Sequence, residues 1–273
     1  MMIKFIKAMK AMKAEMLKQH KVYFHNKIIY VSLFIWPLLS FISSYFSFKP
    51  FNINSSTVSY LNEKNLLIFI LLGYICMSFF RSLVQSAWNF SFERLSGTLE
   101  YIYLSPVNRF AVILGNALSS LFESVWVMVV FSIGIFIMKH EYFNINIPAA
   151  IITFLLMIVM AIMWGMLLNA IFLFSRDSGF LFTVLEEPME IFSGVKVPTT
   201  IFPFWAKIIS FIFPLTYVLD AIRKVFLNGA NLAEVKSSIL CSIFIILLMF
   251  VIINLCLILG EKHAKKTGNM TLF

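Results

Sequence analysis

The sequence is short of charge and of the residues that usually mark a catalytic centre. Only 13% of its 273 residues are charged, whereas 60% are hydrophobic. One soluble core does not need that much apolar material, but a bundle of membrane helices does. The composition therefore predicts an all-α, polytopic membrane protein.

Cysteine and catalytic motifs are also scarce. The three cysteines, Cys76, Cys241 and Cys256, lie in or beside apolar runs and show no CxxC spacing. Neither a disulfide framework nor a zinc site is indicated by that pattern. The chain contains no HExxH and no GxSxG sequence, and its 4 histidines are scattered near expected membrane borders. These absences argue against a hydrolase and against a metal site.

The net charge of +9 does not indicate a nucleic-acid partner because of where the basic residues lie. Seven lysines fall between Lys4 and Lys27, and Lys262, Lys265 and Lys266 crowd the C-terminus. Basic residues beside apolar spans mark the cytoplasmic side and favour contact with membrane lipids. We expect both termini to be cytoplasmic. The abundance of Lys, Ile, Asn and Phe is typical of an AT-rich bacterial genome, which suggests a bacterial inner membrane.

Six apolar runs approach the length of about 20 residues that a bilayer core requires. They are residues 28–48, 66–88, 110–138, 148–174, 180–197 and 239–259. The fifth is the weakest. No internal repeat, low-complexity tract or soluble domain interrupts them, so we expect residues 1–273 to form one domain.

Residues 1–25 have the pattern of a helix that lies on the membrane. Phe5, Met9, Met12 and Met16 follow i, i+4, i+7, i+11 spacing, and most lysines fall on the opposite side. This pattern suits an interfacial helix with its basic face toward anionic headgroups. The alternative is a solvated basic tail.

The stretch 180–219 carries Glu186, Glu187, Glu190 and Lys196 among its prolines. A charge in hydrocarbon costs about 3 kcal/mol or more, so such residues face protein or water. Broken backbone at membrane depth is tolerated only where it is buried in protein or lines a cavity. We expect the three glutamates to act in a gate or to contact substrate.

Arg81 lies well inside the second apolar run. Its polar neighbours at helical spacing are Ser78, Ser82, Gln85, Ser86 and Asn89. One interpretation is an arginine that lines a pathway and contacts an anionic or polar substrate. The other is a structural ion pair with Glu123 or an acid of the fifth run, or snorkelling toward the headgroups.

The segment between the second and third runs contains a short amphipathic pattern. Leu95, Leu99 and Ile102 recur at i, i+4, i+7. Ser105 and Pro106 then suit the N-cap and first helical position of the third span. A short helix held between two long ones can take a push from a cytoplasmic partner, whereas the alternative is an ordinary interfacial loop.

This segment resembles the cytoplasmic motif of the ABC-type-2 transporter permeases, the membrane subunits of ATP-driven exporters. The residues that carry the resemblance are Glu93, Arg94, Gly97, Thr98, Leu99, Glu100, Ser105 and Pro106. Residues 190–198, 213–217 and 221–223 are similar to the outer-face segment of that family. The order and spacing of these motifs extend the resemblance over essentially the whole chain.

The resemblance implies a half-transporter in which two identical or similar permeases pair, each docked on a separate ATPase subunit. Residues 93–106 would form the coupling helix, and residues 187–214 would form a re-entrant helical hairpin that closes the outer mouth. Arg81 and the three glutamates would lie along the pathway or gate. This chain has no GxxxxGK[ST] loop, so ATP and Mg²⁺ would bind the partner, and no cofactor is expected here.

Two other classes of function stay open at this point. A membrane-embedded lipid-modifying enzyme would need paired acids or histidines at one depth, for which residues 186–190 are the only candidate. An ATP-independent immunity or sensor protein would have no ATPase partner. The exported substrate is not indicated, because the permeases that the chain resembles handle drugs, peptides, lipids, glycans and ions.

Overall fold

The computed structural model describes residues 2–23, 27–48, 65–138, 145–172 and 178–267, and these residues are helical apart from short turns. The helices in chain order are α1 (Met2–Tyr23), α2 (Lys27–Phe48), α3 (Leu66–Leu95), α4 (Thr98–Leu104), α5 (Arg109–Met138), α6 (Ile147–Phe172), α7 (Ser178–Phe192), the 3-10 helix η2 (Thr199–Ile201), α8 (Phe204–Ser210), α9 (Leu215–Asn228) and α10 (Lys236–Thr267). The expected all-α class is confirmed over this part of the chain.

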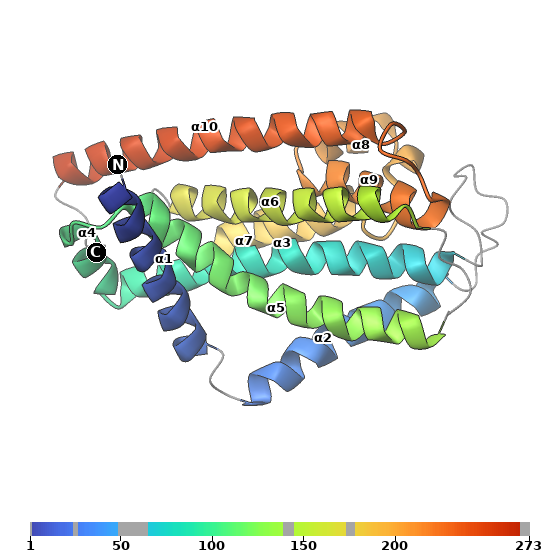
Figure 1. Cartoon of the computed structure of the whole chain (residues 1–273), viewed down its shortest axis with the longest axis horizontal. Coiled ribbons are helices and arrows are strands. Elements are labelled where there is room, and N and C mark those ends of the chain that lie inside the picture. Colours follow the sequence, from blue (N-terminus) through green and yellow to red (C-terminus); the bar gives the residue numbers. More distant parts are fainter. Residues whose placement is uncertain (1, 24–26, 49–64, 139–144, 173–177, 268–273) are drawn as a thin grey trace.

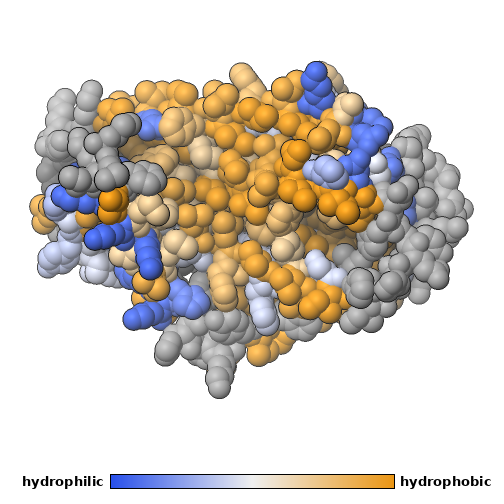
Figure 2. All heavy atoms as spheres, viewed as in Figure 1, coloured by the Kyte–Doolittle hydropathy of each residue, from blue (hydrophilic) through white to orange (hydrophobic). Residues whose placement is uncertain are grey.

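The long helices lie lengthwise in one bundle, and the two ends of the bundle differ (Figure 1). At one end α1 crosses the bundle, beside α4 and the C-terminal end of α10. At the other end lie α8, α9 and the start of α10. Hydrophobic side chains form a broad band across the middle of the bundle, and most of the hydrophilic residues lie at its two ends (Figure 2). This distribution is the one that a membrane-spanning bundle requires.

Among the residues that the structure describes, four helices are long and apolar enough to cross a membrane, over Leu66–Val84, Arg109–Ile133, Ile147–Ile171 and Lys236–Leu259. These segments confirm the second, third, fourth and sixth expected spans. The first run forms α2, whose apolar part, Val31–Ser47, is shorter, and the fifth forms α7, which has 15 residues. Helices α8 and α9 supply a fifth candidate span if they are counted together.

A bent pair of apolar helices, which is either a broken span or a re-entrant loop, extends further along the chain than the hairpin that the sequence pattern suggested. Helix α7 continues through Pro188 to Phe192, and the bent pair consists of α8 and α9, which meet at 97° over residues 204–228 rather than 187–214. The prolines mark helix starts here, because Pro203 and Pro214 directly precede α8 and α9. A proline is well tolerated at a helix start, where its missing N–H removes no hydrogen bond.

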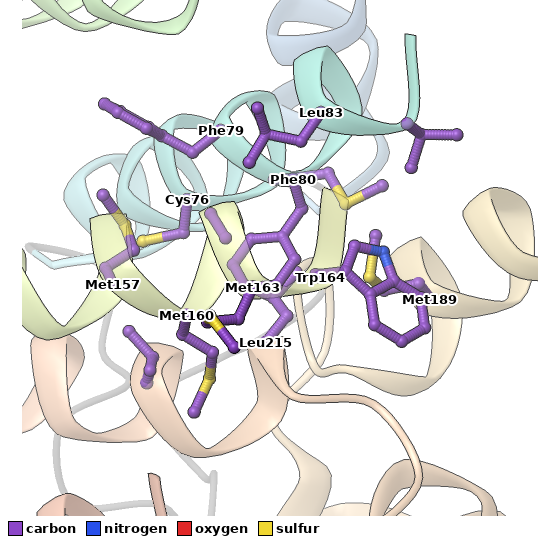
Figure 3. Close-up of a cluster of buried hydrophobic side chains, with 14 of the residues drawn as sticks. Cys76, Phe79, Phe80, Leu83, Met157, Met160, Met163, Trp164, Met189 and Leu215 are labelled. Carbon is purple, nitrogen blue, oxygen red and sulfur yellow. The ribbon is translucent and has the colours of Figure 1, made fainter. Parts of the chain in front are cut away.

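Helix α3 is the centre of the bundle, since 83% of its span is buried, against 22% for α10. The side chains of Phe79, Phe80 and Leu83 are completely buried. They pack against methionines and Trp164 of α6, with Met189 of α7 and Leu215 of α9 close by (Figure 3). The unbranched methionines fill irregular gaps between these aromatic rings.

Buried polar side chains join α3 to α5 and α6. The Asn116 amide donates to the Ser86 carbonyl over 3.0 Å, and the Asn169 amide donates to the Ser86 hydroxyl over 3.2 Å. The hydroxyls of Ser82 and Ser124 also bond to each other. Each such bond between membrane helices is worth about 0.6 kcal/mol, and together they fix how the three helices are rotated.

Helix α1 packs directly on α5 because Gly115 has no side chain. A Cβ atom at this position would lie 2.8 Å from the Met12 carbonyl oxygen and 3.0 Å from Glu15 Cβ. The expected N-terminal helix is present as α1. Its polar residues Glu15 and Gln19 are buried against the bundle, whereas the apolar Met9 is half-exposed. A small residue at a helix interface permits this close approach.

Gly115→Leu is expected to push α1 off α5, since the new side chain overlaps the α1 backbone. Overpacking of this kind costs about 1–3 kcal/mol. Hydrogen exchange of the α1 amides measures the effect and should become at least several-fold faster. Val129→Leu, on an exposed face of the same helix, is the control. Unchanged α1 protection in Gly115→Leu would show that this contact does not hold α1.

Candidate functional site

An ion-paired group, here called the Arg81 cluster, consists of Arg81, Glu186, Glu190 and Lys196. Arg81 Nε lies 2.5 Å from Glu186 Oε1, and Arg81 Nη2 lies 3.1 Å from Glu190 Oε2. Lys196 Nζ lies 2.9 Å from the other oxygen of the same carboxylate, Glu190 Oε1. One carboxylate therefore bridges two cations that come from different parts of the chain.

The cluster follows from where three elements meet. Glu186 and Glu190 are separated by four residues on α7, so they share a face of that helix. Arg81 faces them from the middle of α3, and Lys196 reaches back from the turn that follows α7. Of the two interpretations of Arg81, the ion pair with acids of the fifth run is present. Glu187 is exposed and is rotated by about 100° from Glu186.

The exposed part of the cluster is cationic, although its four formal charges cancel. The side chains of Arg81 and Lys196 are 44% and 43% exposed, whereas those of Glu186 and Glu190 are only 4% and 17% exposed. The acids lie behind the cations. A molecule that approaches from the open side therefore meets positive charge first.

Arg223 of α9 is buried, an arrangement that the sequence analysis missed. Its guanidinium donates to the carbonyls of Gly194 over 2.5 Å and Val195 over 2.7 Å, and lies 3.6 Å from the ring centre of Phe69. The available signal in the sequence was its spacing, because a residue four positions after the apolar Leu219 lies on the same face of a helix. Arg223 therefore holds the turn that contains Lys196 against helix α3.

Gly73 permits the same contact from the α3 side. A Cβ atom at this position would lie 2.5 Å from the Val195 carbonyl oxygen and 2.9 Å from Arg223 Nη2. The backbone of α3 thus approaches the turn as closely as packing allows. Together, Gly73 and Arg223 set the distance between Lys196 and the α3 helix that carries Arg81.

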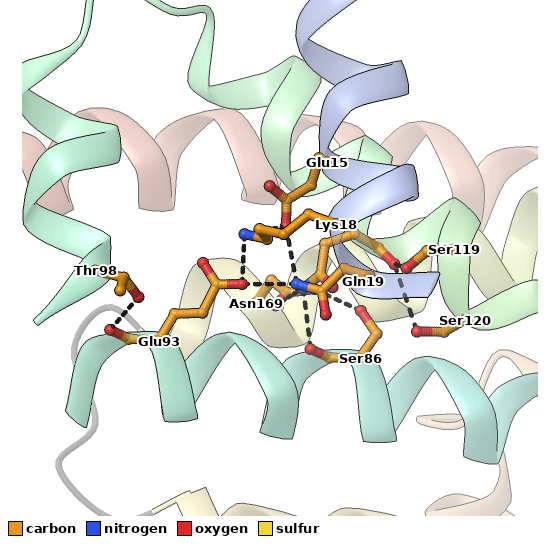
Figure 4. A network of polar contacts seen from close by, with 10 residues as sticks. Glu15, Lys18, Gln19, Ser86, Glu93, Thr98, Ser119, Ser120 and Asn169 are labelled. Carbon is orange, nitrogen blue, oxygen red and sulfur yellow. Dashed lines mark hydrogen bonds and ion pairs between the residues drawn. The ribbon is translucent and has the colours of Figure 1, made fainter. Parts of the chain in front are cut away.

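A second polar network lies at the end of the bundle where α1 and α4 meet α3 (Figure 4). Lys18 Nζ is 2.8 Å from Glu15 Oε1 and 2.6 Å from Glu93 Oε1. The Gln19 amide donates to the same two oxygens, and the Thr98 hydroxyl donates to the Glu93 carbonyl over 3.0 Å. These contacts tie α1 to the last turns of α3 and to the start of α4.

Burial and pairing act in opposite directions on the titration of this network. Burial raises the pKa of Glu93, and the neighbouring Glu15 adds to that shift, while Lys18 and Gln19 oppose it. For Lys18, burial alone would lower the pKa, but hydrogen bonds to Glu15 and Glu93 raise it overall. Lys18 therefore stays charged at neutral pH and offsets the two carboxylates.

The residues expected to form the coupling helix lie at a sharp turn between α3 and α4. Glu93 and Arg94 belong to the end of α3, which finishes at Leu95, and α4 then occupies only Thr98–Leu104. Gly97 has a φ of 70°, a left-handed conformation that favours glycine. The side chains of Arg94, Leu99 and Glu100 lie outside what the structure describes, whereas Ile102 is half-buried against the core.

Ser105 and Pro106 do not begin the third span, contrary to the expectation from the sequence. The Ser105 hydroxyl donates to the Ile102 carbonyl over 2.7 Å, which ends α4. Helix α5 begins three residues after Pro106, where Asn108 Oδ1 accepts the backbone N–H of Phe110 over 3.0 Å. Pro106 disfavours helical backbone at Ser105, whose ψ is 147°, so Asn108 becomes the cap.

Helix α4 presents two large side chains to its surroundings, Tyr101 at 76% and Leu104 at 83% exposure. Beside it, a groove of about 510 Å³ runs between α1, the end of α3 and the start of α5. Ala11 and Ala14 form part of its apolar wall, and Glu93 and Lys18 form part of its polar wall. This end of the bundle therefore offers both protruding and recessed surface to another protein.

No cluster of metal ligands competes with these two regions. Within the residues that the structure describes, no three His, Cys, Asp or Glu side chains lie close enough to hold a metal ion. A separate cavity of about 230 Å³ between α3, α5, α6 and α9 has an almost wholly apolar lining. It supplies no charged group.

Comparison with known families decides the class of protein. Residues 7–255 match the family described as "ABC-2 family transporter protein". The chain belongs to the ABC-2 transporter family. It is a membrane permease, the transport subunit of an ABC transporter. No curated protein matches this permease.

Lys18→Met is expected to make the attachment of α1 to the permease depend on pH. Without the cation, which opposes the effect of burial, the pKa of Glu93 rises further. A raised folded-state pKa gives stability below the ordinary value of 4.5 and loses it as pH rises. Protection of α1 amides should therefore be lower at about pH 8 than at about pH 5, by ~1–2 kcal/mol, a value reduced because water reaches the Lys18 side of the network.

The wild-type permease should show a smaller fall, because the pKa of Lys18 is raised from 10.5 and the cation, which opposes the raised pKa of Glu93, persists throughout this range. Lys13→Met removes an exposed lysine of the same helix and serves as the control. Equal pH profiles for Lys18→Met and Lys13→Met would contradict the role given to the network.

Arg223→Met is expected to lower the free energy of unfolding by about 3 kcal/mol, because it leaves two buried carbonyl groups without their charged donor. Thermal or denaturant unfolding in detergent measures the loss. Lys224→Met is the matched control, since Lys224 pairs with Asp220 at a half-exposed site over 2.7 Å. An exposed pair is worth about 1 kcal/mol or less. Equal losses in the two variants would contradict a stabilising role for the hydrogen bonds from Arg223 to the Gly194 and Val195 carbonyls.

Proposed function

We propose that this permease forms the translocation pathway of an ABC exporter as a dimer, with itself or with a similar permease. Each permease binds a separate ATPase subunit, which holds ATP and Mg²⁺. The observation that carries this proposal is α4, a short helix at the end of the bundle with Tyr101 and Leu104 exposed. A family member with such a surface requires a partner to cover it.

The membrane arrangement has six spans, of which α2 and α7 complete the set. At about 1.5 Å per residue, α2 is ~33 Å long and matches a hydrocarbon core of ~30 Å. Helix α7 is shorter and needs the turn after it to reach the far side. The lysine-rich α1 lies at the same end as the end of α10 (Figure 1). The positive-inside rule supports a cytoplasmic location for that end, in a bacterial inner membrane.

The coupling segment, residues 93–106, transmits force from the ATPase. Thr98 bonds to the carbonyl of Glu93, and Glu93 pairs with Lys18, so a displacement of α4 moves α3 and α1 together. Arg81 lies twelve residues before Glu93 on the same helix, about 18 Å away along the axis. A shift of α3 is therefore felt at the Arg81 cluster.

The Arg81 cluster and Glu187 lie along the pathway or gate. Arg81 is 44% exposed on the single permease, although charge facing hydrocarbon is costly. That exposed face is satisfied in the membrane by water or by the second permease. The acids Glu186 and Glu190 are both held in ion pairs, an arrangement that does not favour the acid–base chemistry of a lipid-modifying enzyme.

Purification of the tagged permease from mild-detergent membranes, followed by mass spectrometry, tests the proposal. We expect a stoichiometric soluble protein with a phosphate-loop motif. Tyr101→Asp and Leu104→Asp should each reduce its recovery by about tenfold or more, as loss of a buried hot spot does. Leu232→Asp changes an exposed leucine outside this surface and is the control.

Recovery of the intact permease without any ATPase, in repeated preparations, would exclude the exporter proposal and favour an ATP-independent sensor. Equal recovery of the ATPase with all three variants would retain the exporter but reject α4 as the docking element. Membrane insertion of each variant is checked by its extraction from sedimented membranes.

A further inference from the structure

We propose that the exposed cations of the Arg81 cluster bind the anionic group of an amphiphile, a molecule with a phosphate or carboxylate on a hydrocarbon chain. This inference rests on the proposed export function, because it names the class of substrate that the pathway accepts. It adds Lys196 to the binding residues.

The geometry of Glu190 shows that the two cations can share one anionic group. Its two oxygens lie 3.1 Å from Arg81 Nη2 and 2.9 Å from Lys196 Nζ. A phosphate or a second carboxylate is of similar size, so it can span the same two cations from their open side. The ion pairs use two of the N–H groups of Arg81 and one of those of Lys196, which leaves donors for a ligand.

The order of burial determines the sign of the charge that is recognised. Arg81 and Lys196 are exposed to similar extents, 44% and 43%, and the carboxylates of Glu186 and Glu190 lie behind them. The acids hold the cations in place and reduce the cost of desolvating them. A cationic ligand that approached this face would meet Arg81 and Lys196 before Glu186 or Glu190, while the exposed Glu187 lies about 100° further round α7.

The apolar surroundings favour an amphiphile over a free anion. Arg81 lies inside the span Leu66–Val84, which is mostly apolar and holds no other charged residue. On α7, Ile191 follows Glu190 directly and is 58% exposed. Beyond it, Phe192 packs edge-on against Trp205, which is 59% exposed. A hydrocarbon chain has apolar surface to cover next to the cations.

The experiment uses the full-length permease in neutral detergent and three probes. Dioctanoyl phosphatidic acid carries both chain and phosphate, dioctanoylglycerol carries the chain alone, and inorganic phosphate carries the anion alone. The affinity of each is measured by titration of tryptophan fluorescence. We expect saturable binding of the phosphatidic acid and at least about tenfold weaker binding of either part.

Variants locate the binding. Arg81→Gln and Lys196→Gln should each weaken phosphatidic acid binding about tenfold, as expected for a lost charge-assisted hydrogen bond. Arg81→Lys and Lys196→Arg should retain most of it. Glu190→Gln should strengthen it severalfold, because the cations lose a competing anion. Lys207→Gln, which removes a lysine of α8, is the control, and Lys7→Gln tests capture by the basic α1.

Three results would overturn the inference. The first is equal binding of dioctanoylglycerol, and the second is binding that survives in the Arg81→Gln, Lys196→Gln double variant. The third is a dimer that dissociates in that variant with lipid affinity unchanged, which would make the face a contact between permeases. Because the binding assay needs no ATPase, its failure with the ATPase still recovered rejects the substrate class and leaves the exporter intact.

Discussion

The position of Arg81 inside an apolar span constrains much of the structure around it. A guanidinium inside this span must be compensated, because an unpaired charge facing hydrocarbon is costly. The compensation comes from Glu186, 105 residues further along the chain and 2.5 Å away. These ion pairs hold α7 against α3 with Glu186 and Glu190 facing Arg81. They also place the turn after α7, because its Lys196 pairs with Glu190. Here the electrostatic requirement, rather than apolar packing alone, fixes which faces of the two helices meet.

The same helix α3 connects the two polar regions of the permease. Its span is 83% buried, so it has little freedom to bend, and its contacts at Gly73 and Ser86 are close and specific. At one end Glu93 joins it to α1 and α4, and further along the axis Arg81 joins it to α7. Packed interiors transmit displacement because they are dense and resist compression. A rigid, buried α3 is therefore suited to carry a push from α4 to the Arg81 cluster.

The sequence predicted features that depend on hydrophobicity and periodicity, and it failed where a tertiary contact decides. Four spans and the N-terminal helix follow from apolar runs and from the spacing of Met9, Met12 and Met16. The start of α5 was misplaced because Ser105 and Pro106 resemble a helix start, and Asn108 supplies the actual cap. The burial of Arg223 could not be read from its charge, because its acceptors are carbonyls of a distant turn. The sequence analysis named acids of the fifth run as possible partners of Arg81. It could not show that the ion pairs form, because that depends on α3 and α7 lying side by side.

In the proposed gate, the balance within the Arg81 cluster would hold one arrangement of α3 and α7 without locking it. Fully buried ion pairs are costly to break, because each partner is left without compensation. Here the two cations remain nearly half-exposed while the acids are covered. When α3 moves relative to α7, Arg81 and Lys196 can exchange a protein carboxylate for water or for another anion. The acids stay near the cations and allow the pairs to form again. A cluster of this design would favour one arrangement of α3 and α7 but permit another, which is what the proposed ATP-driven gate requires.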